Sequence, residues 1–246
     1  MIALKTITTI ELSNICNLKC RYCINRLLVK DPVRTPGIMS GETFERALHY
    51  LRILVKNGTQ DTINLNGDGE SCLDPQLPQR IRMVKDITGG IMVNMCTNGV
   101  NMTPELARSI ADAGIDRCDL SPHSPFHARR ALRYMANAGI RGVINYGAIT
   151  ASHNWAGQLE PENSVPCNIT NACDSLIEGR GYILTEGNVT PCCYDYRNLG
   201  VFGSVYDDDL LEQPIRTFEL CGACHQRIPK YVLRKMDAEE KEVCNG

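Results

Sequence analysis

The chain has 246 residues, a formal net charge of −2 at pH 7 and a sequence pI of about 6.2. This length suits one large domain, or one domain with a smaller appendage. The near-neutral charge gives no general attraction to nucleic acid or to anionic membranes. No apolar run approaches the roughly 20 residues that cross a bilayer, and the N-terminus lacks the pattern of a signal peptide. We therefore expect a cytoplasmic protein with no membrane partner. The basic residues Arg129, Arg130 and Arg133 make nucleic acid an alternative partner. This alternative is the less favoured one, because few aromatic residues lie among them to stack on bases.

Five strands and four helices are predicted to alternate over the first 150 residues. The strands are expected at 6–12, 61–66, 91–96, 115–120 and 141–149, and the helices from Ser40 to Asn57, from Asp74-Pro75 to about Lys85, from Thr103-Pro104 to near Gly114, and over 126–138. Such alternation predicts an α/β fold with parallel strands. Five strands are too few for a closed eight-stranded barrel. We therefore expect a partial (β/α) barrel or an open sheet.

Polar clusters follow the ends of four of these strands, at 16–23, 67–70, 97–99 and 121–124. In a parallel α/β sheet the loops at the carboxyl ends of the strands form the active edge. The sequence therefore predicts that these clusters converge on one site. His123, in the fourth cluster, is the tentative catalytic base, and His153, Glu160 and Asp195 are further candidates.

Thirteen cysteines are unusual in a reducing compartment, where metal ligation or catalysis explains thiols better than disulfides do. Cys16, Cys20 and Cys23 form a CxxxCxxC motif directly after the first predicted strand. Three thiolates suit three corners of a cubane iron–sulfur cluster. The fourth iron then keeps an open position for chemistry. A structural zinc site is the alternative, but zinc motifs usually come as pairs, and no second pair is near in sequence.

The sequence changes character after residue 150, which divides the chain into a 1–150 core and a 151–246 linker and cysteine-rich domain. Residues 151–166 are polar and read as a linker or lid, 181–191 as a hairpin, and 228–242 as a helix. Cysteines recur at positions 167, 173, 192, 193, 221, 224 and 244. A zinc ribbon at Cys192, Cys221 and Cys224 is one interpretation of this region. Only fifteen residues precede Cys16, so we expect no leader-peptide recognition domain before it.

With these motifs in hand, the chain resembles radical S-adenosylmethionine (SAM) enzymes. CxxxCxxC after the first strand is the signature of that superfamily, and 67–70 reads GDGE where the family has glycine-glycine-glutamate, so that only Gly69-Glu70 matches cleanly. The resemblance implies a [4Fe-4S] cluster on Cys16, Cys20 and Cys23. The implied SAM-binding residues are Tyr22, Gly67, Gly69, Glu70, Asn98 and Ser121. The resemblance also implies reductive cleavage of SAM to a 5′-deoxyadenosyl radical, with an electron donor such as flavodoxin or ferredoxin.

The last third of the chain resembles the SPASM/Twitch domains, which hold auxiliary [4Fe-4S] clusters. Cys173, Cys192, Cys221 and Cys224 match the ligand pattern, and the absence of cysteines in 225–241 fits the one-cluster Twitch type better. The overall layout is also similar to that of 2-deoxy-scyllo-inosamine dehydrogenase, a Twitch enzyme. This resemblance implies a small α+β domain and oxidation of a small substrate, with electron transfer to the auxiliary cluster. Three alternatives stay open: a redox-neutral isomerase or epimerase, an enzyme that modifies an amino-acid, peptide or nucleotide-linked group, and a zinc-binding interaction module.

Overall fold

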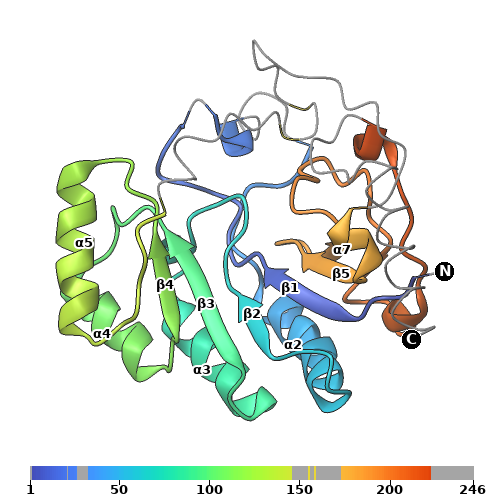
Figure 1. The fold of residues 1–246 in the computed structure, drawn as a ribbon, viewed down its shortest axis with the longest axis horizontal. Helices are drawn as coiled ribbons and strands as arrows, with labels where there is room; N and C mark the ends of the chain where they lie inside the picture. The colour runs from blue at the N-terminus through green and yellow to red at the C-terminus, as the bar shows by residue number, and fades with distance from the viewer. Residues whose placement is uncertain are drawn as a thin grey trace, which may run out of the picture.

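The computed structural model describes residues 2–20, 22–26, 33–145, 155, 158 and 173–222. In these residues, strands form one sheet in the order β4-β3-β2-β1-β5-β6-β7 (Figure 1). Their bounds are β1 Thr6–Ile10, β2 Thr62–Asn64, β3 Met92–Thr97, β4 Arg117–Leu120, β5 Arg180–Ile183, β6 Asn188–Thr190 and β7 Gly203–Ser204. Strands β1 to β4 pair in parallel, as their alternation with helices predicted. The sheet is open, which confirms the α/β class and the partial-barrel architecture.

Three of the four main helices connect successive strands from β1 to β4, and the fourth follows β4. Helices that are neighbours along the chain pack against each other on one side of the sheet (Figure 1). They are α2 Gly41–Lys56, α3 Leu77–Thr88, α4 Pro104–Asp112 and α5 Pro125–Asn137, with the short α7 Asp174–Ile177 later in the chain. The predicted starts of α2 and α4 are confirmed, and the Ser40 and Thr103 hydroxyls accept hydrogen bonds from the first turns of these helices. None of the helices in the described residues is long and apolar enough to cross a membrane.

Helix α3 begins later than predicted. Asp74 Oδ1 accepts a hydrogen bond from Gln76 N at 2.9 Å, and its carboxylate pairs with Arg80 at 2.8 Å. These contacts keep 74–76 in a turn, because a short Asp side chain competes with the helix for the backbone. The helix therefore starts at Leu77 rather than at Asp74-Pro75.

The fifth predicted strand is present as a short extension beside β4. Cys118 N donates to Arg141 O at 2.8 Å, and Leu120 N donates to Val143 O at 2.9 Å. The bridges from Arg117 to Arg141 and from Leu120 to Ile144 are parallel, as predicted. The rest of that prediction, over 146–149, lies outside the described residues.

The cysteine-rich part of the chain continues the same sheet. Strand β5 lies parallel to β1, with Thr6 opposite Arg180, and β5 and β6 form the predicted hairpin. Gly187 in its turn has φ +95°, a conformation that favours glycine. The domain boundary at residue 150 stays a prediction, and the predicted 228–242 helix lies outside the described residues.

Candidate functional site

Ten of the predicted site residues line one cavity of about 550 Å³ at the carboxyl ends of β1 to β4. They are Cys16, Cys20, Tyr22, Cys23, Gly67, Gly69, Glu70, Asn98, Ser121 and His123. Four loops supply them, one after each parallel strand. We call this space the SAM-side cavity. The predicted convergence of polar clusters is thus present in the structure.

The loop after β2 packs tightly against the start of the cysteine loop. Glu70 N donates to Ile15 O at 2.9 Å. A Cβ at Gly69 would lie 2.3 Å from Ser13 O, and one at Gly67 would lie 2.3 Å from Glu11 Cγ. Both glycines therefore permit a close approach, as predicted, and here it is to the protein's own chain. This contact sets the distance between the thiols and Glu70.

Glu70 is buried, and three donors fix its carboxylate. Oε1 accepts from Cys72 N at 3.1 Å and from Thr97 Oγ1 at 2.7 Å, while Oε2 accepts from Asn98 N at 2.8 Å. The TNG sequence after β3 thus orients the glutamate of the loop after β2. A carboxylate held in this way forms a strong charge-assisted bond with an ammonium group.

The thiols of the motif lie in an apolar setting. Burial raises the pKa of Cys16 and raises that of Cys23 to about 12. Leu18 N donates to Cys16 Sγ at 3.4 Å, and Asn98 Nδ2 approaches the same sulfur at 3.9 Å. The Cys16 and Cys23 thiols are therefore protonated near neutral pH until a metal displaces the proton.

Tyr22 and His123 form a pair above the second thiol. Tyr22 Oη lies 2.6 Å from His123 Nδ1, and Cys20 Sγ lies 3.7 Å from the same nitrogen. Burial lowers the pKa of His123 and, with Cys20 adding to it, raises that of Tyr22 to about 12. The Tyr22 hydroxyl and His123 Nδ1 therefore share one short hydrogen bond, whose donor is set by the tautomer of the imidazole. With Nδ1 engaged, His123 is better placed to support Tyr22 than to act as a base through that nitrogen.

The donor set fits an iron–sulfur cluster with bound SAM. Three thiols and an oriented carboxylate share one cavity, whose size falls in the roughly 300–1,000 Å³ range of ligand pockets. No three Cys, His, Asp or Glu side chains in the described part of the chain are grouped closely enough to hold a single metal ion. Each thiolate of a cubane cluster binds its own iron, so such ligands need not converge on one point.

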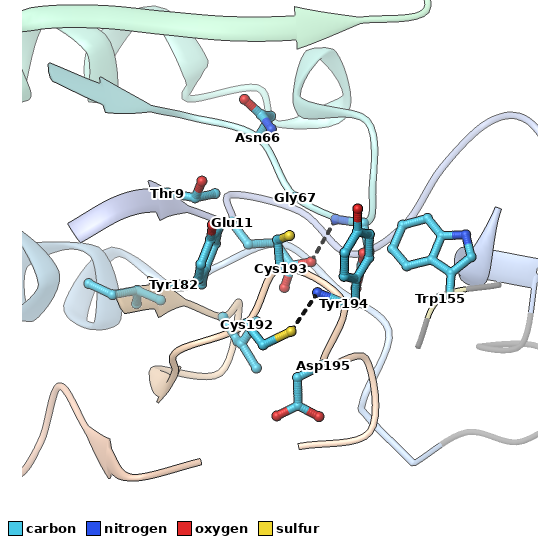
Figure 2. Close-up of a pocket in the computed structure, with 13 residues that line it drawn as sticks. Thr9, Glu11, Asn66, Gly67, Trp155, Tyr182, Cys192, Cys193, Tyr194 and Asp195 are labelled. Atoms are coloured by element: carbon cyan, nitrogen blue, oxygen red, sulfur yellow. Dashed lines mark hydrogen bonds between the residues drawn. The ribbon is translucent and has the colours of Figure 1, made fainter. Parts of the chain in front are cut away.

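A second, smaller cavity of about 220 Å³ adjoins the first, and we call it the inner cavity (Figure 2). It shares Asn66, Gly67, Asp68, Trp155 and Tyr194 with the SAM-side cavity. It is also lined by Cys192, Cys193 and Asp195, the neighbours of Tyr194 in the segment that follows β6. The inner cavity therefore lies between the predicted SAM site and one of the predicted auxiliary-cluster cysteines, Cys192.

The remaining predicted cysteine ligands are less closely grouped. Cys173 precedes α7 and Cys221 lies in the 3-10 turn Glu219–Gly222, and both pack against the main core. Cys224 lies outside the described residues, as do Cys167, His153 and Glu160. Whether Cys173, Cys192, Cys221 and Cys224 bind one cluster stays a prediction.

Sequence reasoning missed a buried charge cluster beneath the inner cavity, which we call the Arg34 cluster. Arg34, with no exposed side-chain surface, contacts Glu11 after β1, Asp68 after β2 and Glu186 in the β5–β6 turn. Glu186 accepts two hydrogen bonds from the guanidinium, each of 2.9 Å, while Asp68 Oδ2 lies 3.4 Å from Nη1. Although burial opposes both charges, Glu11 and Glu186 raise the pKa of Arg34, and Arg34 lowers the pKa of Glu186. The available signal was Glu11 itself, a buried glutamate within the 6–12 run predicted as the first strand.

Comparison with known proteins was made on sequence and on fold. The sequence profile of the Radical SAM superfamily matches residues 10–149. GTP 3',8-cyclase of Campylobacter fetus subsp. fetus (strain 82-40) is 26% identical over 138 residues, which are 54% of this chain and 41% of that protein. PqqA peptide cyclase of Streptomyces rochei is 33% identical over 112 residues, or 46% and 28%. The matched part of the chain thus spans less than half the length of these relatives.

Two solved structures share the fold. The crystal structure of BtrN in complex with AdoMet and 2-DOIA has a TM-score of 0.67 at 20% identity, over 85% of this chain and 82% of that one. Native anSMEcpe with bound AdoMet has a TM-score of 0.59 at 14% identity, over 85% and 80%. At these identities the likeness concerns the fold alone.

Proposed function

Because the chain belongs to the radical SAM superfamily, we propose that it oxidises a carbon–hydroxyl group of a small substrate by two electrons. Membership implies a [4Fe-4S] cluster and SAM as cofactors. When bound, these supply a hydrogen-abstracting carbon radical, and an auxiliary cluster supplies an acceptor for the remaining electron. The substrate carbon loses a hydrogen atom, its hydroxyl loses a proton to a base, and one electron leaves, so a carbonyl forms.

The residues that would hold the first cofactors are those of the SAM-side cavity. Cys16, Cys20 and Cys23 would bind three irons of the cluster. Glu70, oriented by Thr97 and Asn98, would bind the ammonium of SAM. Cys173, Cys192, Cys221 and Cys224 would bind the auxiliary cluster. A strong external reductant such as flavodoxin or ferredoxin would supply the first electron.

The observation that carries this proposal is the position of the inner cavity. It shares Asp68 with the SAM-side cavity and is also lined by Cys192 and Cys193, which Figure 2 labels. A substrate bound there would lie between a radical source and an electron acceptor. That arrangement supports oxidation over a reaction with no net electron transfer.

A nucleotide-linked substrate is the second candidate, and the relatives named GTP 3',8-cyclase favour it. It would place a phosphate-bearing group in the same cavity. The charge of the inner cavity, considered below, bears on this choice.

The test begins with the metal content after anaerobic reconstitution. Two clusters give about eight irons per chain, and either the Cys16/Cys20/Cys23→Ala triple variant or Cys192→Ala with Cys221→Ala lowers this to about four. A single cluster in the wild-type protein, or zinc in the second site, would exclude the auxiliary role.

The second measurement is product analysis with SAM and candidate substrates. If the reaction is an oxidation, each 5′-deoxyadenosine formed should be matched by one product molecule that is oxidised by two electrons relative to the substrate, without an added oxidant. A product isomeric with its substrate would overturn the proposal.

A further inference from the structure

We infer that the inner cavity binds a substrate through a protonated amine, anchored on Asp68, and that phosphorylated substrates are excluded. This inference rests on the proposed function, because it takes the inner cavity as the substrate site. Its argument comes from the charge, hydrogen bonding and aromatic lining of that cavity.

The described wall of the inner cavity carries carboxyl groups and no basic side chain. Glu11, Asp68 and Asp195 line it, and no Lys, Arg or His is among its described lining residues. The cation beneath it, Arg34, has no exposed side-chain surface and is shared among three carboxylates. A phosphate entering here would meet the carboxylates of Glu11 and Asp195 and no exposed cation among the described lining residues, which opposes binding.

Two of the three lining carboxylates are fully engaged by the protein. Glu11 accepts from Asp68 N at 3.0 Å, from Thr185 N at 3.0 Å and from Thr185 Oγ1 at 2.7 Å, besides its pair with Arg34. Asp195 holds its own loop, accepting at 2.7–2.8 Å from the Thr190 hydroxyl and from Leu199 N and Gly200 N. These two carboxylates serve the fold.

Asp68 has bonding capacity left over. Among the described residues, the hydrogen bond of its carboxylate is the long one of 3.4 Å from Arg34 Nη1 to Oδ2. Its side chain keeps 11% of its surface exposed and lines both cavities. Oδ1 is therefore the carboxylate oxygen that can accept a hydrogen bond from a ligand.

Two aromatic rings complete the lining. Trp155 and Tyr194 meet edge to face, with centroids 5.5 Å apart, and Figure 2 shows both rings beside Gly67. The indole N–H donates to Tyr22 O at 2.9 Å, so the indole brings its ring rather than its donor to the cavity. A carboxylate with aromatic rings is the lining that favours an alkylammonium group, through charge and cation–π attraction.

The protonation of Asp68 supports the same choice. Burial is the main cause that raises the pKa of Asp68, to about 8. The negative charges of Glu11, Asp195 and Glu186 add to this rise, and the positive charge of Arg34 opposes it. At pH 7 the carboxyl is then mostly protonated in the empty site. An ammonium group that binds it stabilises the carboxylate and lowers that pKa, so amine binding releases roughly 0.9 proton.

The experiment measures binding of three matched probes to the cluster-loaded protein with SAM, by anaerobic titration calorimetry. The probes are cyclohexylamine, cyclohexanol and cyclohexyl phosphate, which share a ring and differ in charge. We expect cyclohexylamine to bind ~10- to 100-fold more tightly than cyclohexanol, because the free energy of one charge-assisted hydrogen bond corresponds to an affinity ratio of this size. We expect no binding of cyclohexyl phosphate. The amine titration should release a proton at pH 7, detected by repeating it in buffers of different ionisation enthalpy.

Asp68→Asn should remove both the preference for the amine and the proton release. Glu178→Gln is the matched control, because it removes an exposed carboxylate that pairs with Arg180 and is not among the described residues that line the cavity. Tighter binding of the phosphate than of the amine, equal binding of amine and alcohol, or no saturable amine binding overturns the inference. These results need no turnover, so they are distinct from failure of the proposed oxidation, which shows in the product.

Discussion

Replacing Arg34 with methionine should strongly destabilise the protein. Arg34 has no exposed side-chain surface, and its partners Glu11, Asp68 and Glu186 keep 2%, 11% and 30% of theirs. Removing the cation leaves Glu11 as a buried carboxylate with no opposite charge. Breaking a buried pair in this way costs about 3–5 kcal/mol. The backbone and hydroxyl donors that Glu11 retains place the expected loss near the lower end of that range.

The measurement is urea unfolding of the reconstituted protein under anaerobic conditions. Arg180→Met is the control, because Arg180 and Glu178 form an exposed pair, for which about 0–1 kcal/mol is expected. Adding Glu11→Gln to Arg34→Met should recover part of the loss, since glutamine carries no charge to compensate. A loss for Arg34→Met no larger than for Arg180→Met would refute the reasoning about buried charge.

Three further predictions concern the SAM-side cavity and its neighbours. Gly69→Ala should weaken SAM binding at least ~10-fold in equilibrium dialysis, because its Cβ would lie 2.3 Å from Ser13 O; unchanged affinity would show that the loops separate at no cost. Thr97→Val should weaken SAM binding by roughly 3- to 10-fold, because it removes the hydrogen bond that orients Glu70. Thr103→Val is the control: it removes the cap of α4, so it should lower stability and leave SAM affinity unchanged. Asp68→Asn should flatten the fall in unfolding free energy between about pH 4 and 8, since a carboxyl whose folded pKa is raised loses stability as pH rises to that value. An unchanged pH slope would show that Asp68 ionises normally.

Local patterns in the sequence predicted most of the core. The predicted helix starts at Ser40 and Thr103 are confirmed, because a helix start depends on a few neighbouring residues that cap it. The start of α3 was misplaced because Asp74 pairs with Arg80 within its own segment, and residue spacing does not distinguish a first turn from a preceding Asx turn. The convergence of polar loops followed from topology, since parallel strands end at one edge.

The sequence by itself determined the parallel βα order, the thiol motif and the loops that meet at the site, because periodicity and short motifs are local properties. Only the tertiary structure placed β5 beside β1, and with it the inner cavity next to the SAM-side cavity. It alone joined Arg34 to carboxylates from three segments of the chain. A buried cation selects partners by distance and desolvation, which depend on the assembled fold and leave no periodic trace in the sequence. For the same reason, the raised pKa of Asp68 arises only once the fold buries it beside Glu11, against the opposing effect of Arg34.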